Sequence, residues 1–493
     1  MQTTETLTTL RNATLDDLPT AVARPTYDRA ALRPGIVHIG LGNFHRAHQA
    51  WYLHRLMQAG QAHDWAIIGA GVRAGDAAMR DRLKAQDCLT TLIELDPAGQ
   101  AVEVTGSMID FLPVAENNAP LIACLADPAI RIVSLTITEG GYYLAPGGGL
   151  DLGHPDILHD IAHPATPRSV FGALLAGLRA RRDAGALPFT VQSCDNLQGN
   201  GDITRRAVLD LAQALDPALA DWIAETGAFP NSMVDCIVPA TGEAEIALAR
   251  AAGIADAAPV THENFRQWVI EDRFCAGRPP WEDVGATLTD DVHAFEVMKI
   301  RLLNAGHQVL ANAGEILSLD TIRDCMTDPE VSALFDRVTR TEIAPQVADV
   351  PGTTPGAYID LITRRFANPQ IRDTVRRVAF DGASRHAGFL LPTLRDALAA
   401  EGAVSGLALV EALWARMCAG TRDEGTQIAP NDPDWDRLQQ TALIAREDPA
   451  VWLGLPCYGD LAEAERFAGE FAGWLVALHR DGCRATIRRY LSA

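Results

Sequence analysis

A chain of 493 residues is too long for one ordinary hydrophobic core, so two or three domains are expected. Its formal net charge of -21 argues against nucleic acid or an anionic membrane as a partner, because either would repel such a surface. The nine cysteines stand singly with no C-x-x-C pair, which disfavours a disulfide framework and favours a reducing compartment.

No segment predicts export, membrane insertion or metal binding. Met1–Glu5 contain neither a basic region nor an apolar core, so no secretory signal is expected. No apolar stretch approaches the roughly 20 residues of a membrane helix. His45 and His48 lie three apart, but no cysteine or carboxylate cluster accompanies them. These features predict a cytoplasmic protein that binds a metabolite-sized ligand and no metal.

Strand and helix patterns alternate in the first half of the chain and give way to helices in the second. Strands are predicted over Gly35–Gly40, Trp65–Gly69, Arg131–Ile137 and Pro188–Ser193, with a helix over His48–Met57. Helices are predicted over Val309–Leu319, Val331–Thr339 and Leu407–Ala419. The alternation favours a parallel sheet covered by helices. We therefore expect an α/β domain over residues 1–290 and a mainly α-helical domain over residues 291–493.

A glycine-rich turn follows the first strand. Gly40-Leu41-Gly42-Asn43-Phe44-His45 opens a helix, where a dinucleotide fold places a pyrophosphate. His45 stands where the usual fingerprint has a third glycine, so a simple strand-turn-helix is the alternative. After the second strand, Asp76 is suited to accept hydrogen bonds from a ribose 2′-hydroxyl and to repel a 2′-phosphate. Arg73 favours the opposite, and on balance the sequence favours NAD over NADP.

Lys299 is the candidate general base. The chain has only two lysines, Lys84 and Lys299, against forty arginines. A buried lysine can release its proton, whereas arginine keeps its proton at any workable pH. At about 100° per residue, Glu296, Lys299, Asn304 and His307 fall within one helical arc of about 140°, so we expect them to share a face. The alternative is a solvated Glu–Lys ion pair.

Several ordered motifs together resemble the polyol-specific long-chain dehydrogenases. That family includes mannitol and arabinitol dehydrogenases and the fructuronate and tagaturonate reductases. The motifs are Gly40-x-Gly42-x-Phe44-His45-Arg46-Ala47-His48, Ser134 to Tyr142, Ser193-Cys194-Asp195-Asn196, Phe229 to Asp235, and Lys299-x4-Asn304-x2-His307. The resemblance runs nearly end to end, and the altered glycine fingerprint is typical of the family.

The resemblance implies a metal-independent oxidoreductase with a Rossmann-type amino-terminal domain and a helical carboxyl-terminal domain, the active site lying between them. It implies that Lys299 takes the alcohol proton, that Asn196 and Asn304 hold the developing alkoxide, that His307 and Asp235 orient substrate hydroxyls, and that Glu296 passes protons to solvent. It implies cofactor binding by Gly40, Gly42, Asn43, Phe44, His45 and Arg46, with Asp76 at the ribose. Long-chain members are often monomeric, so a monomer or weak homo-oligomer is expected.

Departures from the family pattern leave the substrate class open. Arg385 stands where the family has a lysine, and Cys236 stands where many members have an arginine. Arg377 matches a family arginine of the substrate pocket, and a planar guanidinium can clamp a carboxylate. The first expectation is oxidation of a mannitol-like polyol at C2 to a fructose-like ketose. The alternatives are a hexuronate reductase acting on an aldonate, a D-arabinitol dehydrogenase, and a nucleotide sensor without chemistry.

Overall fold

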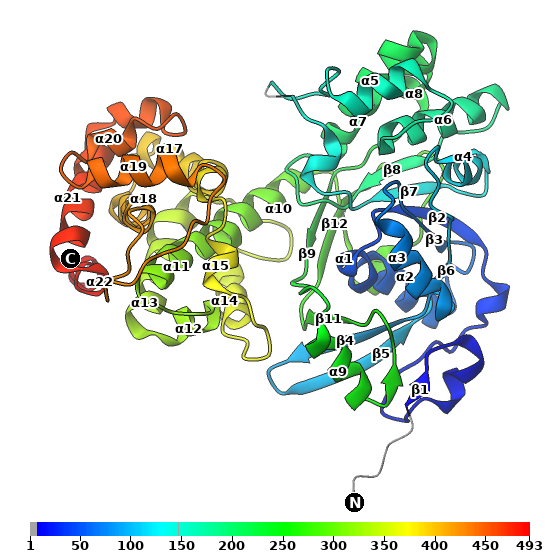
Figure 1. The fold of residues 1–493 in the computed structure, drawn as a ribbon, viewed down its shortest axis with the longest axis horizontal. Coiled ribbons are helices and arrows are strands. Elements are labelled where there is room, and N and C mark those ends of the chain that lie inside the picture. The colour runs from blue at the N-terminus through cyan, green and yellow to red at the C-terminus, as the bar shows by residue number, and fades with distance from the viewer. Residues whose placement is uncertain (1–6, 146) are drawn as a thin grey trace, which may run out of the picture. The chain divides into compact units, whose positions relative to one another are not determined.

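The computed structural model describes residues 7–145 and 147–493 (Figure 1). The chain divides into two compact units, Met1–His293 and Ala294–Ala493. Met1–Glu5, which carry no predicted export signal, lie outside the described residues. Among the residues that are described, no helix is long and apolar enough to cross a membrane. The same residues contain no group of three or more His, Cys, Asp or Glu side chains that could hold a metal ion.

A five-stranded parallel sheet forms the centre of the first unit. Its strands are β2 (Pro34–Ile39), β3 (Ala66–Ala70), β6 (Met108–Phe111), β7 (Ile132–Leu135) and β8 (Thr190–Ser193). They lie in the order β6-β3-β2-β7-β8, and every neighbouring pair is parallel. The chain leaves β2 toward β3 and β6 on one side and returns to β7 and β8 on the other. The predicted parallel sheet is confirmed, and β2 lies where ligands bind in sheets of this class.

Alternate side chains of β2 enter two different cores, as the two-residue period of a strand requires. Val37 and Ile39 pack into one core with helices α4, α6 and α7, whereas Ile36 packs into the other with α2. The helices of this unit are α1 (Asn43–Ala47), α2 (Gln49–Gln58), α3 (Asp76–Ala85), α4 (Ala119–Ala126), α5 (Pro155–Ala162), α6 (Val170–Asp183), α7 (Asn200–Leu215), α8 (Pro217–Thr226) and α9 (Glu243–Ala251). Helices therefore cover both faces of the sheet (Figure 1).

Three smaller sheets in this unit were not predicted. Their strands are β1 (Thr8–Thr9), β4 (Thr90–Asp96), β5 (Gly99–Thr105), β9 (Ser232–Asp235), β10 (Ile254–Ala255), β11 (Val260–Glu263), β12 (Gln267–Glu271) and β13 (Thr287–Thr289). The orders are β1-β10, β11-β4-β5 and β13-β12-β9. Strands β4 and β5 form an antiparallel pair, and so do β9 and β12. Most of these pairings join segments far apart in the chain, which local patterns do not reveal.

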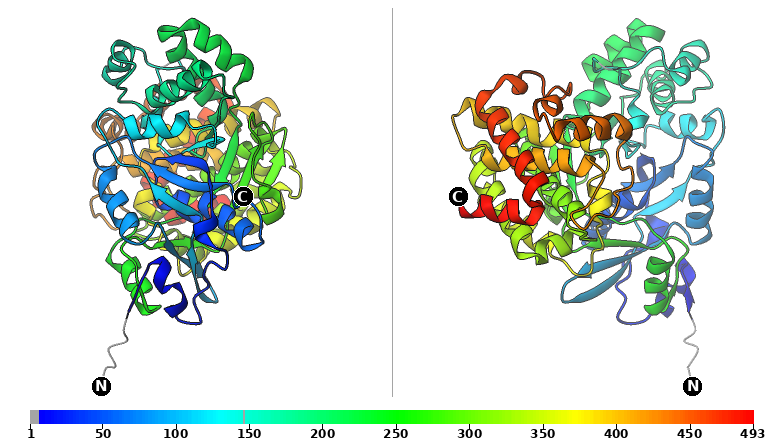
Figure 2. Two further views of the ribbon diagram at one scale, coloured as in Figure 1. Left: turned by 90° about the vertical axis from the view of Figure 1, so that its right-hand side faces the viewer. Right: turned by 60° about the vertical axis from the view of Figure 1, so that its left-hand side comes forward.

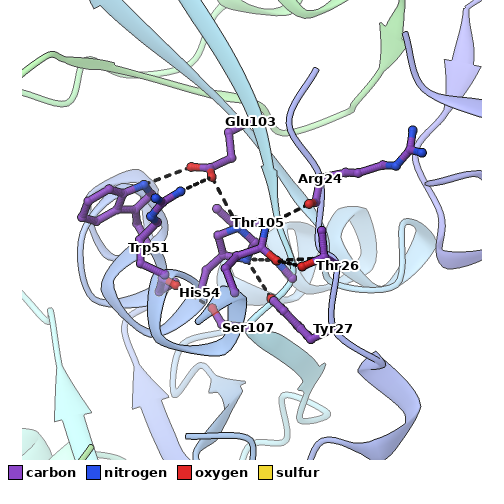
Figure 3. Close-up of polar contacts among 12 residues, drawn as sticks. Arg24, Thr26, Tyr27, Trp51, His54, Glu103, Thr105 and Ser107 are labelled. Atoms are coloured by element: carbon purple, nitrogen blue, oxygen red, sulfur yellow. Dashed lines mark hydrogen bonds and ion pairs between the residues drawn. The ribbon is translucent and has the colours of Figure 1, made fainter. Parts of the chain in front are cut away.

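A polar cluster fastens the segment before β2 to helix α2 and strand β5 (Figure 3). The Tyr27 hydroxyl lies 2.7 Å from Nδ1 of His54, and Nε2 of the same ring lies 3.4 Å from the Glu103 carboxylate. The side chain of Gln58 accepts hydrogen bonds from the backbone N–H and the hydroxyl of Thr26, at 2.8 and 2.7 Å. These bonds hold residues 26–27 against α2, and so fix the chain as it enters the central sheet.

Helices build the second unit (Figure 2), all of whose residues are described and none of which lies in a strand. After α10 (Val292–Met298) come α11 (Ala305–Ile316), α12 (Ile322–Thr327), α13 (Pro329–Val338), α14 (Pro355–Phe366), α15 (Val375–Val378), α16 (Gly382–Arg385), α17 (Leu391–Ala399), α18 (Ser405–Cys418), α19 (Trp435–Ala445), α20 (Ala450–Leu453), α21 (Glu465–Asp481) and α22 (Cys483–Ser492). Every residue of α18 after Ser405 is buried, so this mostly apolar helix is covered on all sides and forms the centre of the unit. The predicted helical half is confirmed.

Candidate active site

Two glycines shape the turn after β2, and each is required for a different reason. Gly40 has a φ of +88°, and a Cβ there would lie 2.2 Å from the carbonyl oxygen of Thr136. Gly42 has an ordinary φ of -109°, and the nearest atom to its Cβ would be the Gly40 oxygen at 4.0 Å. The fold therefore requires Gly40. Gly42 leaves open space beside the first turn of α1, where a dinucleotide fold brings the backbone close to a pyrophosphate.

Asn43 and Arg46 hold this turn in place by hydrogen bonds. The Asn43 amide donates to the Pro239 carbonyl at 3.0 Å and to the Thr241 hydroxyl at 2.9 Å. The buried Arg46 guanidinium donates to the Gly42 carbonyl at 3.3 Å and to the Asn43 side-chain oxygen at 2.7 Å. Burial lowers the pKa of Arg46 to about 10, which leaves the side chain charged at neutral pH. A fixed positive charge next to the turn favours the binding of an anion there.

A cavity of about 440 Å³ adjoins the same turn. Its lining includes Asn43, Arg46, Met79, Arg82, Pro239 and Thr241. The two arginines give this cavity a positive character within a strongly acidic chain. Both the cavity and the open side of Gly42 fit an anionic ligand with apolar parts.

His45 occupies the place of the third fingerprint glycine and belongs to the core. Its ring stacks on His38 of β2 with centroids 3.5 Å apart, and both rings are buried. Burial lowers the pKa of His38 to about 3 and holds the pKa of His45 well below its ordinary value. Two neutral imidazoles therefore fill the contact between helix and strand that glycine usually makes.

His38 also links the sheet to the glycine turn. Its Nε2 lies 2.8 Å from the Thr136 hydroxyl, which donates to the Gly40 carbonyl at 2.7 Å. Its Nδ1 lies 2.8 Å from the Ser134 hydroxyl. Phe44 is placed separately, stacked on His48 with centroids 4.8 Å apart. The motif histidines and phenylalanine thus hold the turn in shape.

Asp76 opens helix α3, just beyond the end of β3. Its carboxylate accepts the Arg73 backbone N–H at 3.0 Å. A Cβ at Gly71 would lie 2.3 Å from the Asp76 Cβ, so the carboxylate depends on a glycine at position 71. This contact fixes Asp76 at the end of the second strand of the Rossmann order, where the adenosine ribose binds in such folds.

Asp195 ties together the loops that follow β7 and β8. Its carboxylate accepts the backbone N–H groups of Ile137 and Thr138 at 3.0 and 2.9 Å and the Tyr142 hydroxyl at 2.8 Å. Burial raises the pKa of Asp195, and these donors oppose the rise. Sequence reading singled out the exposed neighbour Asn196 and missed Asp195, although both lie in one motif. Asp195 fixes the backbone from which Asn196 projects.

Lys299 begins a π-helical segment that the sequence did not predict. Helix α10 ends at Met298, Lys299–Asn304 is π-helical, and α11 continues from Ala305. In a π-helix the hydrogen bonds join residues five apart, and Lys299 and Asn304 have that spacing. The expected arc of about 140° assumed an α-helical turn, so it was too wide. The larger turn brings both side chains to nearly the same side, and π-helical turns are frequent at functional sites.

His307 follows in the first turn of α11. Its ring stacks on Phe366 with centroids 4.1 Å apart, and its Nε2 lies 3.9 Å from the Asp373 carboxylate. Burial lowers the pKa of His307 to about 4, although Asp373 opposes the shift. Arg377 and Arg385 lie close enough to lower this pKa further. The imidazole is therefore neutral at physiological pH and is suited to hydrogen-bond a hydroxyl.

Arg377 is held by a carboxylate that sequence reading missed. Its Nε and Nη2 donate to the two oxygens of Asp373 at 2.7 and 2.6 Å. The spacing of four between Asp373 and Arg377 is a visible signal of an ion pair, but the burial of Asp373 is not visible in the sequence. The Arg377 charge is thus compensated, which weakens the hypothesis that this arginine clamps a substrate carboxylate.

The structure gathers the predicted residues into two groups. The first unit holds Gly40, Gly42, Asn43, Phe44, His45 and Arg46 in the glycine turn and α1, with Asp76 at the start of α3, Asn196 after β8 and Asp235 at the end of β9. The second unit holds Glu296, Lys299, Asn304, His307, Arg377 and Arg385. The side chains of Glu296 and Lys299 are buried, with residue exposures of 4% and 7%. Charged groups buried to this degree need partners or a function.

This combination of a Rossmann-type sheet, a glycine turn and a helical unit with a buried lysine defines a two-domain protein of the dinucleotide-binding dehydrogenase class. More particularly, the chain belongs to the mannitol dehydrogenase family. The family's Rossmann-domain model matches residues 34–283, and its C-terminal-domain model matches residues 291–479. The resemblance stated from the motifs is confirmed.

Curated relatives and solved structures agree with this assignment. Mannitol 2-dehydrogenase of Cereibacter sphaeroides is 55% identical over 474 residues, covering 96% of this chain and 99% of the relative. The structure of Pseudomonas fluorescens mannitol 2-dehydrogenase, a ternary complex with NAD and D-mannitol, has a TM-score of 0.86 at 40% identity and covers 98% of this chain and 99% of that one. A substrate-free D-sorbitol dehydrogenase has a TM-score of 0.90 at 36% identity, with coverages of 97% and 100%.

Proposed function

We propose that the protein oxidises a mannitol-like polyol at C2 to the corresponding ketose, with NAD as hydride acceptor, Lys299 as general base and no metal. The observation that carries this proposal is the buried Lys299 on a π-helical turn that it shares with Asn304, followed by the neutral His307. Relatives named mannitol 2-dehydrogenase, similar along nearly the whole chain, support the same reaction.

The cofactor assignment is supported by the residues around the glycine turn. The open side of Gly42 admits a pyrophosphate, the buried Arg46 supplies positive charge, and Asp76 stands at the ribose position. A carboxylate there disfavours a 2′-phosphate, so we infer NAD rather than NADP. When bound, NAD supplies the acceptor for the hydride that leaves C2. The first unit is then the dinucleotide-binding domain, and the second carries the base.

The chain's own groups handle the proton and the developing charge. Lys299 Nζ, in its neutral form, takes the proton of the C2 hydroxyl, and in ketose reduction it returns that proton. The amide groups of Asn304 and Asn196 donate hydrogen bonds to the alkoxide oxygen. Because an ammonium and two amides stabilise the oxyanion, no Lewis-acid metal is needed. Glu296, one turn before the base, accepts the proton on its way to solvent.

His307 and the Arg377–Asp373 pair, which we place beside the substrate hydroxyls, together carry little net charge. His307 is neutral, and the Arg377 charge is compensated by Asp373. These observations favour a neutral polyol over an aldonate. Asp235 is assigned a hydroxyl-orienting role by the motif that it shares with the family. The hexuronate reductase alternative needs an uncompensated cation, which Arg385 would have to supply. A D-arabinitol substrate remains the alternative among neutral polyols.

The test is NADH formation by chelator-treated protein on D-mannitol, D-arabinitol, D-sorbitol and D-mannonate. We expect turnover of D-mannitol in the presence of chelator and a loss of at least 1,000-fold in kcat for Lys299→Ala, with NADH binding retained. Lys84→Ala is the matched control, because Lys84 is exposed and paired with Asp110 at 2.6 Å. Turnover of D-mannonate alone would reassign the substrate class. Near-normal activity of Lys299→Ala would refute the mechanism.

Two coarser properties complete the proposal. All nine cysteines are free in the structure, which supports a reducing compartment such as the cytoplasm. We expect a monomer or weak homo-oligomer, to be checked by light scattering after size exclusion across a hundredfold range of concentration. A stable assembly at the lowest concentration would contradict this expectation.

A further inference from the structure

Asp373 is a fixed, buried carboxylate that holds an exposed cation. Its backbone is fastened to the start of α12, since the Asp373 carbonyl accepts the Ile322 N–H at 2.9 Å and the Val375 N–H donates to the Asp320 carbonyl at 3.0 Å. The Asp373 side chain is 8% exposed, whereas the Arg377 side chain is 62% exposed. The fold therefore fixes the position of the Asp373 carboxylate, and the exposed Arg377 side chain is held by this carboxylate.

We propose that Asp373 is a specificity-determining residue, which keeps the Arg377 end of the substrate site neutral and so excludes carboxylate-bearing analogues of the polyol. This inference rests on the proposed function, because the family motif places Arg377 at the substrate. It goes further in naming the group that decides between a neutral polyol and an aldonate. Asp373 acts through Arg377, and so it is a positioning residue.

The ion pair with Asp373 occupies one edge of the Arg377 guanidinium and offsets its charge. Asp373 occupies the Nε–Nη2 edge of the guanidinium, which is a fork that binds a carboxylate by two parallel bonds. A substrate carboxylate that took this edge would leave Asp373 buried without its partner, which is strongly unfavourable. The Nη1–Nη2 end of the guanidinium stays open, but a carboxylate that binds there meets a cation whose charge Asp373 already offsets, so its gain is small.

The charges around His307 lead to the same conclusion. Arg365, Arg377 and Arg385 all act to lower the pKa of His307, while Asp373 acts to raise it. Asp373 thus offsets part of a cluster of permanent positive charges. Without it, Arg377 would lose the carboxylate that offsets its charge and would present that charge to any anion that enters.

The experiment compares wild type with Asp373→Asn for two ligands. The affinity for D-mannonate is measured by calorimetry in the presence of NADH, and the KM and kcat for D-mannitol are measured by steady-state kinetics with NAD. Asparagine keeps the shape of the side chain and removes its charge. We expect D-mannonate affinity to rise at least tenfold at 50 mM NaCl, with most of the gain lost at 500 mM. The KM for D-mannitol should change more than kcat, because the base is untouched.

Three further variants make the outcome decisive. Asp336→Asn is the matched control, because Asp336 and Arg340 form another Asp–Arg pair four residues apart, with Nε bonded at 2.7 Å. It should leave D-mannonate affinity unchanged. The double variant Asp373→Asn with Arg377→Gln should lose the gain, and Arg377→Gln alone should weaken D-mannonate binding less than threefold. The last comparison decides the matter even if Asp373→Asn does not fold.

Two results would overturn the inference: unchanged D-mannonate affinity in folded Asp373→Asn, or a tenfold loss of D-mannonate affinity in Arg377→Gln alone. Failure of the proposed function looks different. In that case wild type would turn over no polyol, while the calorimetric comparison of D-mannonate among the variants would still report on the Asp373–Arg377 pair.

Discussion

Alanine at Gly40 should lower the stability of the first unit, whereas alanine at Gly42 should leave stability nearly unchanged and lower cofactor affinity. At Gly40 an L-residue with a φ of +88° costs about 1–2 kcal/mol. The new Cβ would also lie 2.2 Å from the Thr136 carbonyl oxygen, so the turn must move by roughly 1 Å to reach ordinary contact. That movement strains the Gly40 N–H bond to Ala70 at 3.2 Å and the Thr136 hydroxyl bond at 2.7 Å, each worth about 1 kcal/mol.

The sum for Gly40→Ala is a loss of about 3–4 kcal/mol in the free energy of unfolding of the first unit. Gly42→Ala should change this free energy by less than about 0.5 kcal/mol, because its φ is ordinary and no atom lies closer than 4.0 Å. The methyl group instead fills the space proposed for the pyrophosphate, so NADH affinity should fall at least tenfold.

Urea unfolding followed by tryptophan fluorescence gives the stabilities, and quenching titration with NADH gives the affinities. The two variants serve as controls for each other, since they lie two residues apart in one turn. Normal NADH affinity in Gly42→Ala would show that the open space does not receive the cofactor. Wild-type stability in Gly40→Ala would show that the close approach to Thr136 is not as the structure has it.

Acid should destabilise the protein through its buried histidines. The pKa of His38 is lowered to about 3 and that of His307 to about 4, against about 6.5 in an unfolded chain. Below pH 6.5 the unfolded chain therefore binds protons that the folded chain refuses, and stability falls by up to about 1.4 kcal/mol per pH unit for each histidine. Urea unfolding midpoints measured from pH 7.5 to 5 test this expectation. The midpoint of His38→Asn should fall less steeply with decreasing pH than that of wild type, and equal pH dependences would contradict the role of His38. In Asp195→Asn the free energy of unfolding should fall by about 2–4 kcal/mol and kcat by at least tenfold, because three donors lose a charged acceptor beside Asn196. Wild-type values for both quantities would contradict the role of Asp195 in joining the two loops.

The sequence was enough to predict the central sheet because its signals are local. Gly40 and Gly42 mark the turn, and short β-branched runs such as Ile67–Ile68 mark the strands around it. The antiparallel pair β9 and β12 was beyond reach, because residues 236–266, which include α9, β10 and β11, separate the two strands in the chain. Such pairing depends on which faces are buried, and that is decided only when the whole core assembles.

The candidate site was predicted as a set of residues but not as a geometry. Met298, Leu302 and Leu303 make the Lys299 helix apolar outside its one polar arc, and such a pattern does not distinguish an α-helical turn from a wider π-helical one. The π-helical turn that relates Lys299 to Asn304 therefore had to come from the structure. The identity of these residues was readable because lysine is so rare in this chain.

The scarcity of lysine also explains why Asp373 is needed. Arginine is permanently charged, so each arginine near a site for neutral substrates must be compensated or kept at a distance. Arg377 is compensated by a buried carboxylate, and His307 is made neutral by burial. With those two groups fixed in charge, Lys299 is the cationic side chain of this unit whose residue type allows it to release and regain a proton. In the proposed mechanism proton transfer therefore falls to this one amine, and the neighbouring arginines contribute to substrate recognition.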